Sequence, residues 1–150
     1  MRRTGESTDV RSEDPIRVVL AEDHTEFRLG LKEMLATDGG IEVVGEAENG
    51  AQAVALAREV RPDVIVLDLI MPVMEGRETL GLILRDVSPP PGIVILTMHD
   101  QLHLRRELMR IGASAFLAKS ASLAEVIGAV KGSRPMRTPR EDSSEAPPAS

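Results

Sequence analysis

The sequence predicts an α/β protein in which a doubly wound, five-stranded parallel sheet carries five helices on its two faces. Five short runs of β-branched residues, leucine and alanine alternate with five longer segments of helical character. The strand-like runs are apolar throughout, which is typical of strands that are covered on both faces. The connections are short, and this favours right-handed crossovers between parallel strands.

The first third of the chain predicts a strand, a helix and a second strand. Residues 18–21 are apolar and end at the acidic pair 22–23. Residues 24–37 carry apolar side chains at helical spacing, and the Asp-Gly-Gly turn at 38–40 ends this helix. Residues 41–47 predict a strand nearer an edge of the sheet. The apolar side chains of the helix are Phe27, Leu31, Met34 and Leu35.

The rest of the chain continues the alternation of helix and strand. A turn at Asn49-Gly50 precedes a segment rich in alanine, which has the highest helix propensity. Prolines at 62 and 89–91 mark breaks between elements. The predicted helices are 51–60, 75–86, 101–111 and 122–131, and the predicted strands are 64–67, 93–96 and 115–118.

Composition indicates one folded domain, at residues 15–131, with a short segment on either side of it. Residues 1–14 mix both charge signs without apolar periodicity, and residues 132–150 are rich in proline and serine. Neither composition can bury a core, so we expect a disordered lead-in and a disordered tail. The 150 residues are 42% apolar and 28% charged, which is ordinary for a globular protein.

Charge and residue usage exclude several classes of function. A formal net charge of -6 without a basic cluster argues against direct DNA binding. The chain has no cysteine and only three scattered histidines, so thiol chemistry and a transition-metal site are not expected. No apolar stretch approaches the roughly 20 residues that span a bilayer. We expect a cytoplasmic protein with no membrane partner.

Polar side chains follow four of the predicted strands at the point where each strand ends. These side chains are Glu22 and Asp23, Asp68, Thr97 and Lys119. Because the carboxyl ends of parallel strands form the crevice where open α/β sheets bind ligands, the pattern predicts a site at this edge. Clustered carboxylates resist ionising together unless a cation compensates, and such oxygen ligands favour Mg²⁺.

Each of these residues also has a structural interpretation. The acidic pair could cap the following helix, since acids stabilise helix starts by about 0.3–1 kcal/mol. Asp68 could cap the loop before Pro72, Lys119 could be a solvated surface lysine, and Thr97 an ordinary strand residue. The chemical alternative is that Asp68 acts as a nucleophile on phosphorus, with a metal and Lys119 offsetting the charge.

Four separated motifs resemble the receiver domain of bacterial two-component response regulators, over a match from about residue 16 to 131. The variants at 96–100 and 112–119 are most similar to the NarL/FixJ subfamily. The resemblance implies a flavodoxin-like sheet with strand order 2-1-3-4-5. The matching motifs lie at 19–24, 66–76, 95–100 and 112–120.

The resemblance also implies a role for each residue of the site. Asp68 would accept a phosphoryl group from the histidine of a sensor kinase, and Thr97 and Lys119 would hold the phosphoryl oxygens. Asp23, Asp68 and the backbone carbonyl of Ile70 would bind Mg²⁺, with Glu22 assisting through water. The protein would then be a phosphoacceptor rather than an enzyme.

A two-state switch would follow phosphorylation. Thr97 would move inward and open space for Phe116, and the surface of the fourth helix, fifth strand and fifth helix would change its affinity for an output partner. Three residues would tune the lifetime of the phosphoryl group. Ile70 would hinder attacking water, His99 could instead orient it, and Met98 would restrict small phosphodonors.

Other functions stay open from the sequence alone. The main expectation is a stand-alone receiver with an unidentified output protein, and a phosphorylation-dependent homodimer is compatible with it. The alternative is a truncated NarL/FixJ-type transcriptional regulator that acts through a DNA-binding partner. A haloacid-dehalogenase phosphatase would need an acid at Ile70, and a flavin carrier would not place Glu22-Asp23 in a phosphate loop.

Overall fold

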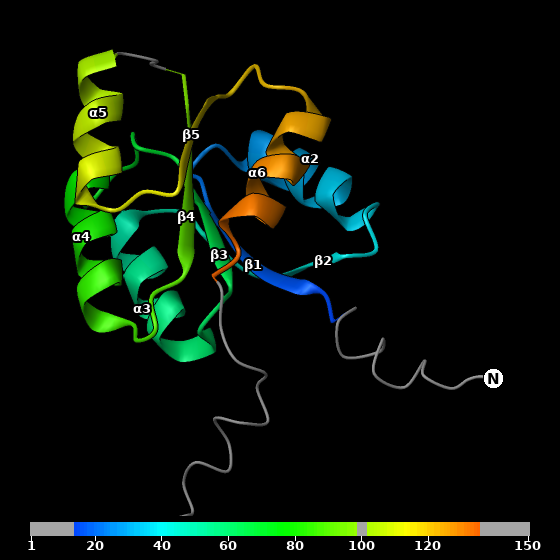
Figure 1. Cartoon of the computed structure of the whole chain (residues 1–150), viewed down its shortest axis with the longest axis horizontal. Helices are drawn as coiled ribbons and strands as arrows, with labels where there is room; N and C mark the ends of the chain where they lie inside the picture. The colour runs from blue at the N-terminus through cyan, green and yellow to red at the C-terminus, as the bar shows by residue number, and fades with distance from the viewer. Residues whose placement is uncertain (1–13, 99–101, 136–150) are drawn as a thin grey trace, which may run out of the picture.

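The computed structural model describes residues 14–98 and 102–135 and contains a five-stranded parallel sheet with five helices (Figure 1). The strand order is β2-β1-β3-β4-β5, which confirms the predicted topology. The strands are β1 (Ile16–Ala21), β2 (Ile41–Ala47), β3 (Val64–Leu67), β4 (Gly92–Thr97) and β5 (Ala115–Ala118). The helices are α2 (Thr25–Ala36), α3 (Gly50–Val60), α4 (Gly76–Asp86), α5 (Leu102–Ile111) and α6 (Leu123–Ser133).

Two hydrophobic clusters lie on opposite faces of the sheet. One cluster joins the sheet to α3, α4 and α5, and the other joins it to α2 and α6. Figure 1 shows the same two layers on either side of the strands. Along β3, Ile65 and Leu67 enter the first cluster while Val64 and Val66 enter the second. A strand whose side chains pack into a hydrophobic cluster on each face of the sheet has no face exposed to solvent. This explains why the run is apolar at every position.

The element boundaries agree with the sequence prediction to within two residues. The predicted edge strand at 41–47 is β2 and does lie at an edge of the sheet. The final helix continues to Ser133, two residues into the segment predicted as tail. Residues 1–13 of the predicted lead-in and most of that tail lie outside the described residues, and so does His99.

The buried face of α2 differs from the one its apolar spacing indicated. Arg28, Leu31 and Leu35 are buried, whereas Met34 is 46% exposed. Arg28 therefore belongs to the buried face of α2, whereas Met34, which the apolar spacing grouped with Leu31 and Leu35, does not. Within the described ranges, the structure contains no helix that is both long enough and apolar enough to cross a membrane.

Candidate functional site

The carboxyl ends of β1, β3, β4 and β5 bring the predicted residues to one edge of the sheet. The backbone ladder continues past the strands, because the Asp68 amide donates to the Ala21 carbonyl at 3.0 Å. The Lys119 amide likewise donates to the Thr97 carbonyl at 2.8 Å. These bonds place Asp68 beside the end of β1 and Lys119 beside the end of β4. The sheet register thus determines which side chains meet.

Three carboxylates form a cluster at this edge. One oxygen from each of Glu22, Asp23 and Asp68 lies within 4.8 Å of the others. Glu22 and Asp68 are 5% exposed, whereas Asp23 faces water. His24, not either acid, is the N-cap of α2, so neither of these acids caps the helix. Glu22 does accept a hydrogen bond from the His24 amide at 2.9 Å, which orients its carboxylate within the cluster.

Lys119 bridges two of the acids. Its Nζ lies 2.8 Å from Oε1 of Glu22 and 3.2 Å from Oδ2 of Asp68. The side chain is only 14% exposed, and its ammonium lies 4.8 Å from the centre of the Phe27 ring, a cation–π distance. The interpretation of Lys119 as a solvated surface lysine is therefore wrong.

Burial and the hydrogen bonds of Lys119 have opposite effects on the pKa values of Glu22 and Lys119. Burial raises the pKa of Glu22 above its ordinary value, although Lys119 and the His24 amide partly offset this effect. Burial would lower the pKa of Lys119, but its hydrogen bonds to Glu22 and Asp68 outweigh that effect, and the net shift is upward. The ammonium is consequently held in its charged form beside the acids.

The loop after β3 folds back over Asp68. Oδ1 of Asp68 accepts a hydrogen bond from the Ile70 amide at 3.2 Å. Further along the loop the Met74 amide donates to the Pro72 carbonyl at 2.9 Å, so Val73 lies at the centre of a three-residue turn. Val73 has a φ of 77°, which is strained for a β-branched residue. Gly76 follows because a Cβ there would come within 2.8 Å of the Leu69 backbone.

Thr97 and Phe116, the predicted switch residues, both lie in the interior. Thr97 ends β4 with 0% exposure, and Phe116 is 6% exposed within the cluster under α5. The guanidinium of Arg105 on α5 lies 5.3 Å from the centre of the Phe116 ring and donates to the Phe116 carbonyl at 3.4 Å. Phe116 therefore occupies an inward position that contacts α5 directly.

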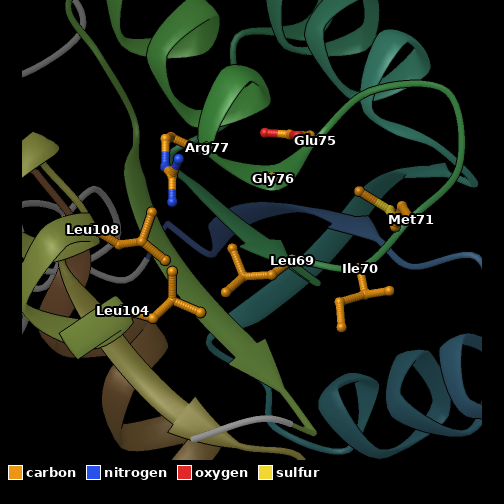
Figure 2. Close-up of a pocket in the computed structure, with 8 residues that line it drawn as sticks. All are labelled: Leu69, Ile70, Met71, Glu75, Gly76, Arg77, Leu104 and Leu108. Atoms are coloured by element: carbon orange, nitrogen blue, oxygen red, sulfur yellow. The ribbon is translucent and has the colours of Figure 1, made fainter. Parts of the chain in front are cut away.

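A largely apolar pocket of about 310 Å³ lies beside the loop after β3, between α4 and α5. Figure 2 shows Leu104 and Leu108 of α5 pointing toward Leu69 of the loop. Ile70 lies at the same pocket with 58% exposure, and Met98 is 73% exposed. Two of the three residues predicted to tune hydrolysis, Ile70 and Met98, thus present apolar side chains to solvent.

Arg28 is a site residue that the sequence analysis missed. It is 6% exposed, and its guanidinium donates to the Glu22 backbone carbonyl at 2.7 Å. The same group lies 2.9 Å from Glu46 and 3.4 Å from Glu48. Its spacing could have indicated this burial, because Arg28 lies three residues before Leu31 and seven before Leu35, on the same face of α2 as these two buried leucines.

The residues present fit a hard divalent cation. The cluster supplies three carboxylates, two of them buried, and Lys119 offsets a single negative charge. Oxygen ligands with excess negative charge suit Mg²⁺, which keeps several of its waters. The exposed Asp23 leaves the cluster open to solvent on one side.

The sheet order and the site together define a class of α/β domain with acids and a lysine at the carboxyl edge. Residues 18–131 match the response regulator receiver domain family, and the chain belongs to this family. It is a signalling phosphoacceptor family of two-component systems, not a family of conventional enzymes. Membership excludes the phosphatase and flavin-carrier alternatives.

Several relatives are transcriptional regulators. LiaR of Bacillus subtilis is 39% identical over 116 residues, covering 77% of this chain and 54% of that protein. YdfI of the same organism is 41% identical over 106 residues, covering 71% of this chain and 49% of that protein. The chain thus spans about half the length of the curated relatives it matches.

Solved structures of receiver domains have the same fold. The signal receiver domain of NarL from Mycobacterium tuberculosis has a TM-score of 0.74 at 34% identity, covering 79% of this chain and 94% of that chain. The response regulator domain of Thermotoga maritima CheB has a TM-score of 0.75 at 27% identity, covering 83% of this chain and 99% of that chain.

Proposed function

We propose that this protein accepts a phosphoryl group on Asp68 from the phosphohistidine of a sensor kinase. The observation that carries the proposal is the buried Asp68 carboxylate, held between the Lys119 ammonium and the Ile70 amide beside two more acids. Packing alone does not call for two buried carboxylates side by side, since each loses hydration. A site that handles a phosphoryl group and a divalent cation does require them.

The transfer is a displacement at phosphorus. An oxygen of Asp68 attacks, a P–O bond forms, and the P–N bond to the kinase imidazole breaks. The imidazole nitrogen keeps the electron pair of that bond and is then protonated, and Asp68 carries an acyl phosphate. Lys119 pairs with the phosphoryl oxygens, and the Thr97 hydroxyl donates to one of them.

Asp23 and Asp68 would hold Mg²⁺ with the backbone carbonyl of Ile70, and Glu22 would assist through water. The ion, when bound, neutralises charge on the phosphoryl oxygens. The oxygen ligands, the burial of Glu22 and Asp68 and the surplus of negative charge support this assignment.

The output surface in this proposal is made by α5, β5 and α6. Arg105 joins α5 to Phe116 of β5, so a change in the position of Phe116 would be transmitted to α5. Thr97 pairs with Ala118 across β4 and β5, which links the phosphoryl site to the same strand. The inward movement of Thr97 and the response of Phe116 remain predictions.

Ile70 supports a slowly hydrolysed acyl phosphate, because its apolar side chain follows the backbone amide that binds Asp68 and would hinder attacking water. His99 could orient water and shorten the lifetime. A half-life of a few seconds would contradict the argument from Ile70.

A sensor histidine kinase is the proposed donor, which places the protein in the cytoplasm, where ATP supplies such kinases. The output partner is a protein, and phosphorylation-dependent homodimers are compatible with the α5–β5–α6 surface. The relatives named as transcriptional regulators support a second candidate, in which the chain regulates transcription through a DNA-binding partner.

Phosphate-affinity electrophoresis tests the proposal. The protein is incubated with Mg²⁺ and either acetyl phosphate or phosphoramidate, since Met98 is expected to restrict some small donors. A shifted band should appear with the wild type and with the control variant Asp86→Asn, which removes a carboxylate at the end of α4. It should be lost in Asp68→Ala and after chelation of Mg²⁺. Failure of both donors and of a phosphorylated kinase domain to shift the wild type would refute the proposal.

A further inference from the structure

Arg28 is the one basic residue among the buried residues that the structure describes. Its guanidinium contacts two segments that flank the acidic cluster. It donates to the Glu22 carbonyl at 2.7 Å, and it lies 2.9 Å from a carboxylate oxygen of Glu46 in β2 and 3.4 Å from one of Glu48 just after β2. Arg28 on α2 thus ties the loop after β1 to the end of β2.

The contact with the Glu22 carbonyl determines the orientation of one peptide unit. That carbonyl belongs to the peptide bond that joins Glu22 to Asp23, so holding it sets the direction from which the Asp23 side chain leaves the backbone. The Glu22 amide is also held, because it donates to the Ala47 carbonyl at 2.9 Å. With both polar groups of the Glu22 backbone engaged, the two acids have little freedom to turn away from Asp68.

Arg28 differs from Lys119 in what it contacts. Lys119 contacts the carboxylates of Glu22 and Asp68 and therefore competes with a metal ion for them. Arg28 instead contacts a backbone oxygen of the acidic loop, and its charge is balanced by Glu46 and Glu48. A planar guanidinium can hold these three acceptors at once, whereas an ammonium is a single point charge.

From this geometry we infer that Arg28 is a positioning residue for the metal site: its hydrogen bond to the Glu22 carbonyl holds Glu22 and Asp23 where they bind Mg²⁺. The inference rests on the proposed function, since it takes the acidic cluster to be the Mg²⁺ site. Outer partners of this kind typically change metal affinity by about 10–100-fold when they are removed.

The sign of the effect separates positioning from simple electrostatics. Removing a cation near an acidic cluster strengthens the attraction of the cluster for Mg²⁺ by Coulomb's law, so the electrostatic effect alone lowers the Kd. Loss of positioning raises the Kd. Weaker Mg²⁺ binding in a folded Arg28 variant therefore cannot be explained by the change in charge.

The experiment is titration calorimetry of the whole chain with MgCl₂, at a temperature where circular dichroism shows each variant to be folded. Arg28→Met should raise the Mg²⁺ Kd by about tenfold or more. Arg28→Lys keeps the charge and should raise the Kd by less. Lys32→Gln is the matched control, since Lys32 also binds Glu46, at 2.8 Å, and shares no bond with the Glu22 carbonyl. Its Kd should stay within roughly twofold of the wild type because Lys32 is half exposed.

Each outcome decides the inference. Folded Arg28 variants that bind Mg²⁺ as tightly as the wild type, or more tightly, overturn it and leave the proposed function intact. If only Arg28→Lys folds, its Kd decides alone. Asp23→Asn shows whether Mg²⁺ binds at this site. If the wild type binds no Mg²⁺, or if Asp23→Asn binds it as well as the wild type does, the acidic cluster is not the metal site. Both the inference about Arg28 and the proposed metal site are then refuted.

Discussion

Replacement of Lys119 by methionine should make the stability of the protein depend strongly on Mg²⁺. The variant keeps an aliphatic side chain but leaves Glu22 and Asp68 without the ammonium that bridges them. Two unit charges no more than 4.8 Å apart repel by at least about 3.5 kcal/mol at an effective dielectric constant of about 20. Protonation of Glu22, whose pKa burial already raises, relieves part of this repulsion. We therefore expect a loss of about 2–3 kcal/mol in the free energy of unfolding.

The assay is urea unfolding at pH 8, with and without saturating Mg²⁺. The sign of the pH effect follows from the raised pKa of Glu22: the folded state favours the protonated carboxyl, so stability falls as pH rises through that pKa. Mg²⁺ should restore most of the loss because it supplies the missing positive charge.

A double-mutant cycle provides the control. Adding Asp68→Asn to the Lys119→Met background removes one of the repelling charges and should recover stability without Mg²⁺. An equal loss with and without Mg²⁺, or no recovery in the double variant, would refute the electrostatic reasoning and leave only lost packing of the lysine stem.

Three further predictions concern residues outside the metal site. Val73→Gly should raise the free energy of unfolding by about 1 kcal/mol, because it relieves a positive φ at a side chain that is 75% exposed and packs little; a lower urea midpoint would argue against strain at this turn. Gly92→Ala should lower the free energy of unfolding by more than about 2 kcal/mol, since the new Cβ would overlap the Ser133 carbonyl oxygen; an unchanged thermal midpoint would contradict this. The pKa of Asp86 is lowered to about 2, chiefly by its hydrogen bond from Arg85, so its stabilising effect should be present above about pH 4 and disappear as pH falls toward 2; acid unfolding of Asp86→Asn should lack this component, and identical acid profiles would count against it.

The sequence predicted the fold well because two different periodicities alternate along it. The run at 64–67 is apolar at every position, which is typical of a strand buried on both faces, and the strand there is buried throughout. The strand ends also identified Asp68, Thr97 and Lys119 correctly as neighbours, since parallel strands bring their carboxyl ends to one edge.

Helical periodicity was a weaker guide to the buried face of α2. Spacing alone groups Met34 with Leu31 and Leu35, and it cannot recognise that a long charged side chain takes an inward position. Arg28 is buried because three acceptors from other segments satisfy its guanidinium, and none of them is adjacent in the sequence.

The sequence by itself determined the order of strands and helices, the edge at which the polar residues gather, and the family. The order of elements along the chain and the polar edge depend on local patterning and on the topology that short crossovers allow, whereas the family follows from the resemblance of four motifs. Only the tertiary structure decided that Lys119 bridges Glu22 and Asp68, and that the Arg28 guanidinium is buried among acceptors from three segments. Those features depend on distances and burial between segments far apart in the chain, and no local pattern contains them.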